Sequence, residues 1–153
     1  LTPLVQRNSI DEGYLDLAPC GFRDAAEIER RVRALQQRIT DELQITASFG
    51  VAANKLVAAI ASKARKPRGF TVVPPGTEAD FLAPLPINVL PGIGKKTEER
   101  VKAAGLHVVR DVFTKTEREL EALFGSFAPE ILRMARGEDD RPVETEHEDA
   151  KSY

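Results

Sequence analysis

Asp11 and Glu12 stand side by side in an otherwise apolar stretch, residues 9–17. Neighbouring side chains of a strand point to opposite faces, so a buried strand here would carry at least one carboxylate into the core. A hard divalent cation compensates such charge, because Mg²⁺ takes oxygen ligands and often uses one or two carboxylates with substrate phosphates. A solvated hairpin turn is the alternative, since Asp and Gly are common turn residues. These residues alone leave both interpretations open.

A glycine-containing turn with two lysines is the second candidate for chemistry. It comprises Pro91, Gly92, Ile93, Gly94, Lys95 and Lys96, and a predicted helix follows it. The glycines let the backbone approach a phosphate, and the free N–H groups at the start of the next helix point at an anion. Lysines add charge without reading bases, so nucleic-acid binding would be sequence-independent and salt-sensitive. The alternative is a packing corner with incidental lysines.

Lys55 is the third candidate, because it begins a predicted helix directly after a predicted strand. From that position a lysine can reach into a cleft at the strand ends and offer a mobile point charge to a phosphate. The alternative is a solvated surface lysine.

The elements that must position these residues fall into two groups. Strands are expected over residues 5–9, 14–17, 45–52 and 70–73, with helices over 25–43 and 54–65. Capping residues Asp24 and Asn54 mark the helix starts, and apolar residues recur every three or four positions after Asp24. Residues 77–82, 96–104, 116–123 and 129–136 predict short helices separated by Pro and Gly. This order predicts an α+β fold: an antiparallel-rich sheet with helices on one face, then a helical unit.

Composition limits the class of protein. The chain has 153 residues with 42% apolar and 30% charged residues, a net charge of −2 and one cysteine, Cys20. No segment reaches the ~18–20 apolar residues of a membrane span, and no signal peptide is recognisable. A single cysteine excludes an internal disulfide and fits a reducing compartment. Basic residues cluster at 63–68 and 95–102, whereas residues 138–149 are acidic and resemble a flexible linker.

Several motifs in register resemble the Y-family, translesion DNA polymerases, closest to the bacterial polymerase IV-like branch. Residues 9–16 match the family's Ser-Ile/Leu-Asp-Glu-Ala-Tyr-Leu-Asp signature, with Gly13 in place of alanine. Residues 45–55 match Leu-Thr-Ala-Ser-x-Gly-Val-Ala-x-x-Lys, and residues 60–67 match Ile-Ala-Ser-x-x-x-Lys-Pro. The turn at 91–94 matches the hairpin of the family's helix-hairpin-helix motif. The resemblance covers essentially the whole chain.

The resemblance implies a role for each candidate. Asp11 is similar to a palm aspartate that bridges two metal ions, and Glu12 to the glutamate on the catalytic ion; the ions would be Mg²⁺. Lys55 resembles the lysine that contacts the incoming nucleotide's triphosphate, and residues 92–96 resemble the thumb element that holds the DNA backbone. Tyr14 and Asp16 are expected to be structural, and His107 and His147 incidental.

The same resemblance predicts the domains and partners. Residues 1–75 would be a palm without its first aspartate-bearing strand and without fingers, 76–137 a helical thumb, and 138–153 a linker towards a little-finger domain. Primer–template DNA and deoxynucleoside triphosphates would be the substrates, and a sliding clamp is a further partner to test for, through a C-terminal region. A bacterial cytoplasmic, nucleoid-associated location follows. The chain begins without methionine, so we expect a piece of a longer polymerase that is inactive by itself but binds DNA.

Two rival classes of function remain from the sequence. The chain could serve as a non-catalytic polymerase-like accessory protein, against which the intact Asp11–Glu12 pair argues. It could also be a stand-alone helix-hairpin-helix module of a repair scaffold, which leaves the first 75 residues unexplained.

Overall fold

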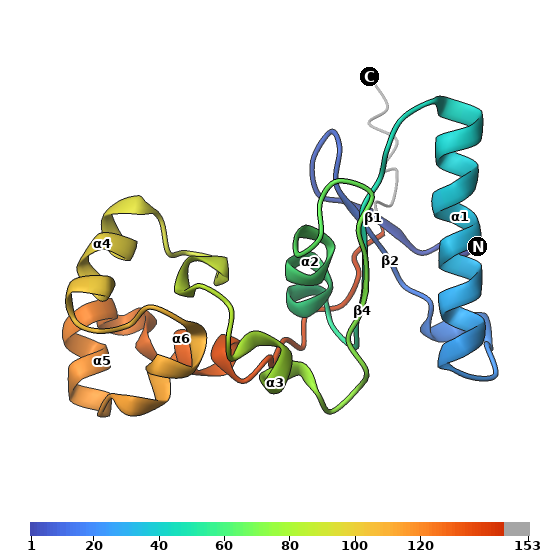
Figure 1. The fold of residues 1–153 in the computed structure, drawn as a ribbon. Coiled ribbons are helices and arrows are strands. Elements are labelled where there is room, and N and C mark those ends of the chain that lie inside the picture. The colour runs from blue at the N-terminus through green and yellow to red at the C-terminus, as the bar shows by residue number, and fades with distance from the viewer. Residues whose placement is uncertain (146–153) are drawn as a thin grey trace, which may run out of the picture.

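A strand-bearing half is followed by a helical half, in the order that the sequence predicts (Figure 1). The computed structural model describes residues 1–145, so His147 and the end of the expected linker lie outside the described part. The first half contains β1 (Val5–Arg7), β2 (Gly13–Leu15), α1 (Ala25–Leu43), β3 (Phe49–Val51), α2 (Lys55–Lys63) and β4 (Phe70–Val72). The second contains α3 (Glu78–Leu82), α4 (Lys95–Ala103), α5 (Glu117–Phe124) and α6 (Ala128–Ala135).

The helices begin at the capping residues that the sequence indicates. Asp24 accepts a hydrogen bond from the Glu27 amide at 2.8 Å, and Asn54 accepts one from the Val57 amide at 2.9 Å. Before α5, Thr116 and Glu119 form a reciprocal capping box. Each side chain satisfies an amide that has no partner inside its helix, which fixes where the helix starts.

The strands differ from the expected single antiparallel-rich sheet. Within residues 1–145 they form two separate two-stranded sheets. β1 and β2 are an antiparallel hairpin in which Gln6 lies opposite Tyr14, whereas β3 and β4 are parallel, with Gly50 opposite Thr71. The parallel pair is joined through α2, because parallel strands need a crossover connection. The α+β class is confirmed, but the expectation of one mainly antiparallel sheet was wrong.

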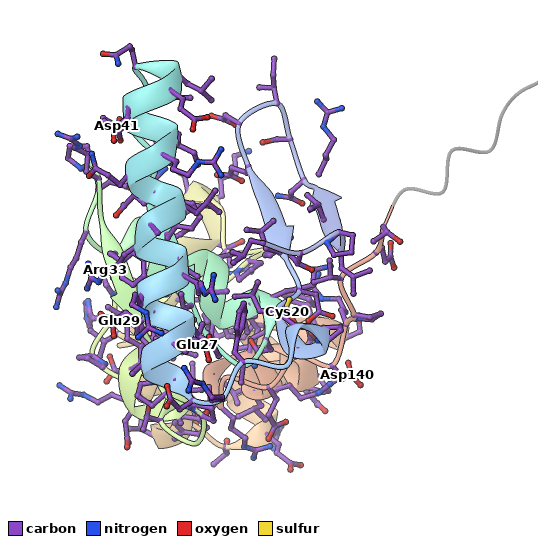
Figure 2. The ribbon with its side chains drawn as sticks, turned by 90° about the vertical axis from the view of Figure 1, so that its right-hand side faces the viewer. Cys20, Glu27, Glu29, Arg33, Asp41 and Asp140 are labelled. Atoms are coloured by element: carbon purple, nitrogen blue, oxygen red, sulfur yellow. The ribbon has the colours of Figure 1, made fainter. Side chains whose placement is uncertain are left out.

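The two helices of the first half also do not share one face, as had been expected. α1 and α2 lie on different sides of the β3–β4 pair (Figure 1). On the α1 side, the Arg33 guanidinium stacks 4.0 Å from the centre of the Phe70 ring. Figure 2 shows Glu29 and Arg33 along α1, and Arg33 also pairs with Glu29 at 2.8 Å. Phe70 and Gly50 occupy positions of opposite side-chain direction in the strand pair, since Phe70 lies opposite Phe49.

Gly50 sets how closely β3 approaches α2. A Cβ atom on Gly50 would lie 2.1 Å from the Ala58 carbonyl oxygen and 2.5 Å from the Ser62 amide nitrogen. Both are backbone atoms of one helix, which cannot move aside independently. Only glycine therefore permits this contact, so packing explains why the segment at 45–55 has a glycine at this position.

The helical half has the larger share of the buried apolar residues. Leu82, Ile87, Leu90, Val101, Leu106, Val109, Val112, Leu120 and Ile131 are each at most 1% exposed. Leu56, Val57 and Ile60 of α2 belong to the same continuous cluster, so α2 connects the halves through apolar contact. No helix within residues 1–145 is both long and apolar enough to cross a membrane.

Replacing Gly50 by alanine tests the close contact between β3 and α2. Overpacking a site that cannot relax destabilises a protein, so we expect Gly50→Ala to lower the free energy of unfolding by about 3 kcal/mol. Gly94→Ala is the matched control: an added Cβ there meets nothing within 4 Å, and losing glycine at a helix N-cap costs at most about 1 kcal/mol. Urea unfolding followed by circular dichroism measures both. Equal effects of the two changes would contradict the packing argument.

Candidate active site and nucleic-acid interface

Asp11 and Glu12 lie at the tip of the β1–β2 hairpin rather than inside a strand. The Glu12 carbonyl oxygen accepts hydrogen bonds from the amides of Asn8 at 2.9 Å and Ser9 at 3.1 Å, which closes the turn. Ile10 at the tip is 99% exposed, and both acids are exposed as well. The turn alternative therefore describes the backbone correctly. Neither carboxylate enters the core, so both can ligate a cation without first leaving a buried position.

The oxygen atoms of the two acids are lightly engaged by their neighbours. The Ser9 hydroxyl donates to Asp11 Oδ1 at 2.9 Å. Glu12 Oε2 accepts a long hydrogen bond of 3.4 Å from Asn8, and Glu12 Oε1 lies 3.8 Å from the Lys63 ammonium. Exposed carboxylates with remaining acceptor capacity suit Mg²⁺, which commonly takes one or two carboxylates plus substrate and water oxygens. Within residues 1–145, no three His, Cys, Asp or Glu side chains cluster as a metal site.

Lys55 stands at the first position of α2, with its ammonium held in place from several sides. Its Nζ atom donates to Gln6 Oε1 at 2.8 Å and to the Pro142 carbonyl oxygen at 3.2 Å. The Tyr14 ring centre lies 5.1 Å from the same atom, within the range of a cation–π interaction. An ammonium has three donors, so two contacts leave one donor for an anion. Lys55 is therefore not a freely solvated surface lysine.

Helix α2 runs beside the hairpin and separates these groups in space. Its first residue, Lys55, contacts β1 through Gln6, whereas its last residue, Lys63, is the one that faces Glu12. Eight residues of helix correspond to about 12 Å. The structure thus places the acids and Lys55 along one hairpin, near opposite ends of α2. Sequence reasoning missed Gln6 and Lys63, because a strand glutamine and one lysine of a basic run carry no pattern of their own.

The turn at residues 91–96 lies in the other half, next to α4 (Figure 1). Gly92 has a φ of +89°, and an added Cβ would lie 2.8 Å from the Phe127 ring. Ile93 is 7% exposed and anchors the turn in the core, while Gly94 is the N-cap of α4 and provides no capping side chain. Lys95 and Lys96 are exposed. The N–H groups of the first turn are therefore open to an anion, with two positive charges beside them.

One difference concerns the element before this turn. A single 3₁₀ turn, Ile87–Val89, precedes it, where the motif predicts a helix on both sides. The segment is nevertheless fixed, because the Ile87 amide donates to the His107 carbonyl oxygen and the Val109 amide to the Leu85 carbonyl oxygen, each at 2.9 Å.

The residues expected to be structural or incidental make local contacts in the fold. Asp16 Oδ1 accepts from the Ala18 amide at 2.9 Å. Tyr14 is half-buried, and burial raises the pKa of its hydroxyl. His107 contributes its backbone amide to Asp111, and hydrogen bonds from the Val108 and His107 amides lower the pKa of that carboxyl. Cys20 is a free, half-buried thiol.

Comparison with known proteins identifies the family. Residues 1–63 match the model of the impB/mucB/samB family, and residues 75–106 match the IMS family HHH motif. The chain is 68% identical over 154 residues to DNA polymerase IV of Opitutus terrae, covering 100% of this chain and 39% of that protein. It is 44% identical over 149 residues to DNA polymerase IV of Xanthomonas campestris pv. campestris, covering 96% of this chain and 41% of that protein.

Solved structures agree with these relatives. The crystal structure of DinB from Sulfolobus solfataricus aligns with a TM-score of 0.85 at 33% identity, over 94% of this chain and 42% of that one. The insertion ternary complex of Dbh DNA polymerase aligns with a TM-score of 0.84 at 33% identity, over 94% of this chain and 42% of that one. The chain therefore belongs to the Y family of DNA polymerases, on its polymerase IV branch. It spans about two fifths of the length of these relatives, 39% of the first.

Proposed function

We propose that the chain is the palm and thumb of a DNA-directed DNA polymerase that performs translesion synthesis. Residues 1–75 are assigned to the palm, 76–137 to the thumb and 138–153 to the connection towards a further domain. The observation that supports this function best is the pair of exposed carboxylates on the hairpin whose Gln6 side chain also holds Lys55. The activity is proposed for the longer protein. The 153 residues alone should not extend a primer, because the family resemblance places another metal-binding aspartate and the fingers outside them.

Asp11 and Glu12 are assigned as the metal-binding and catalytic acids of this chain. The family resemblance implies divalent metal ions, and the exposed oxygen atoms of both acids fit Mg²⁺. Two Mg²⁺ ions, when bound, supply charge stabilisation to nucleotidyl transfer onto a primer 3′-hydroxyl. The chain's own contribution is to present the two carboxylates on a closed turn. Lys63 and Asn8 are the neighbours of the Glu12 carboxylate, at 3.8 Å and 3.4 Å, and both contacts are weak enough to leave its oxygen atoms available.

Lys55 is assigned to the triphosphate of the incoming deoxynucleotide. Its ammonium keeps one donor beyond its contacts with Gln6 and Pro142, and that donor suits a phosphate oxygen. Gly92, Ile93, Gly94, Lys95 and Lys96 are assigned to the DNA backbone, where exposed N–H groups and two ammonium groups can meet phosphates. The incoming nucleotide would thus contact the first half, and the DNA backbone the turn in the second half. A sliding clamp and a location at the bacterial nucleoid stay predictions of the family resemblance.

A chimeric polymerase tests the catalytic assignment. The matching 39% of Opitutus terrae DNA polymerase IV would be replaced by these 153 residues, and primer extension measured under single-turnover conditions. We expect the chimera to extend primers. Asp11→Asn should lower kcat by on the order of 10³ or more, because it removes an anionic ligand and keeps the shape of the side chain.

Asp16→Asn is the matched control, since it makes the same change in the same segment at a side chain whose hydrogen bond within residues 1–145 is with the Ala18 amide. Its kcat should stay within about twofold. An active chimera whose kcat does not respond to Asp11→Asn would refute the catalytic role and favour a non-catalytic accessory function.

Salt-dependent binding tests the DNA interface. The chain should bind duplex DNA weakly and without sequence preference. Replacing Lys95 and Lys96 by alanine should weaken binding equally on all sequences and reduce the magnitude of the salt slope by up to about two, one for each lost phosphate contact. Fluorescence anisotropy over a salt series measures both quantities.

The control removes the same charge elsewhere, from Arg30 and Arg31 of α1, in the other half of the molecule. Its salt slope should match that of the unmodified chain. If both double variants behave alike, net charge alone explains the change, and the turn at 91–96 is only a packing corner.

A further inference from the structure

Residues 137–144, which we call the strap, return from the end of α6 to the palm and hydrogen-bond to it. Their composition is that of a flexible linker, yet they pass beside the start of α2 (Figure 1). At the near end, Asn54 Nδ2 donates to the Gly137 carbonyl oxygen at 2.7 Å. Gly137 has a φ of +76°, and an added Cβ would lie 2.5 Å from Glu78 Cβ. The chain therefore leaves α6 at a position that only glycine fits.

Asp139 fixes the middle of the strap to α2. Its side chain is 6% exposed, and Oδ2 accepts from the Leu56 amide at 2.9 Å. Arg141 donates to Oδ1 and Oδ2 at 2.8 Å each, as a two-pronged ion pair. Leu56 N–H is one of the free amides at the start of the helix, so Asp139 acts as a second cap beside Asn54. The hydrogen bonds from Arg141 and the Leu56 amide hold the pKa of Asp139 below its ordinary value.

The far end of the strap meets Lys55. The Pro142 carbonyl oxygen accepts from Lys55 Nζ at 3.2 Å. Gln6 Oε1 accepts from Lys55 Nζ and from the Glu144 amide, both at 2.8 Å. The Glu144 amide of the strap and the Lys55 ammonium therefore share one acceptor on β1, and the ammonium lies between β1 and the strap. A lysine side chain has several rotamers, and ordering them costs free energy on binding, so an ammonium already held in place binds a phosphate at a lower entropic cost.

We propose that Asp139 is a positioning residue for nucleotide binding: by docking the strap on α2, it holds Lys55 where the triphosphate of the incoming nucleotide is bound. This inference rests on the proposed function of Lys55. Asp139 acts only through the strap, by way of Pro142, and does not touch the nucleotide. The opposite model, in which the strap sequesters Lys55 from the nucleotide, predicts that loosening the strap lowers the KM for the nucleotide, and the experiment below distinguishes the two.

The test uses the full-length chimeric polymerase described above, with single-nucleotide insertion as the assay. Asp139→Asn keeps the shape but removes the charge that faces Arg141. We expect the KM for the nucleotide to rise about five- to tenfold, with kcat and the Kd for primer–template DNA within about twofold. Asp140→Asn is the matched control: this neighbouring side chain is 88% exposed and lies 3.5 Å from Arg133, at the surface in Figure 2. It should leave KM unchanged.

A double variant separates positioning from a general loss of structure. Lys55→Ala alone should raise KM roughly tenfold or more, since it removes a charged donor to phosphate. Once Lys55 is absent, Asp139→Asn should raise KM no further. An unchanged or lower KM in Asp139→Asn, or an effect that simply adds to that of Lys55→Ala, would overturn the inference. An unchanged KM in Lys55→Ala would instead overturn the proposed function of that lysine.

Thermal unfolding of each variant shows whether a change in KM comes from a folded enzyme. If Asp139→Asn unfolds at the assay temperature, Arg141→Gln replaces it, because that side chain is 63% exposed and its loss only loosens Asp139. The same rise of KM with constant kcat is expected, smaller in size. A fully folded Arg141→Gln variant with an unchanged KM would count against the inference.

Discussion

The close contact of α2 with β3 is the constraint on which the rest of the structure depends. Gly50 lets α2 approach β3 until no space for a Cβ atom remains. This contact fixes the position and direction of α2 relative to the β3–β4 pair. The candidate functional residues of the first half are positioned relative to that helix. Lys55 projects from its start, Lys63 faces Glu12 from its end, and Leu56, Val57 and Ile60 extend its apolar side into the core of the helical half.

The start of α2 has several side-chain partners, one of them from a distant segment. Asn54 caps the Val57 amide and at the same time donates to Gly137, while Asp139 caps the Leu56 amide from a segment more than 80 positions away. A carboxylate is favoured there by the positive end of the helix. The same end of the helix also presents the Lys55 ammonium. The negative charge of Asp139 is matched mainly by Arg141, which leaves the Lys55 charge available to an anion.

Sequence patterns predicted the helices well, because the interactions that start and orient a helix involve residues close in the sequence. The capping residue Asp24 and the apolar spacing after it place α1 at residues 25–43, as observed, because a cap and a 3.6-residue period depend only on neighbouring residues. The sheets could not be predicted in the same way. Strands of three residues carry little alternation, and whether two short strands pair depends on distant partners that no local pattern records.

The candidate site shows the same division between residue type and placement. The acids, Lys55 and the glycine turn were found from type and spacing, together with a family resemblance. Gln6 was not, since a glutamine in a short strand is usually only a surface residue. The strap was missed for a stronger reason: acidic residues with glycine and proline are typical of linkers, and composition does not reveal that Asp139 meets a free helix amide. An acidic segment that would be disordered by itself can thus dock on a helix whose first N–H groups are unpaired. Similar acidic segments that follow a helical domain should therefore be compared with the helix starts within their reach.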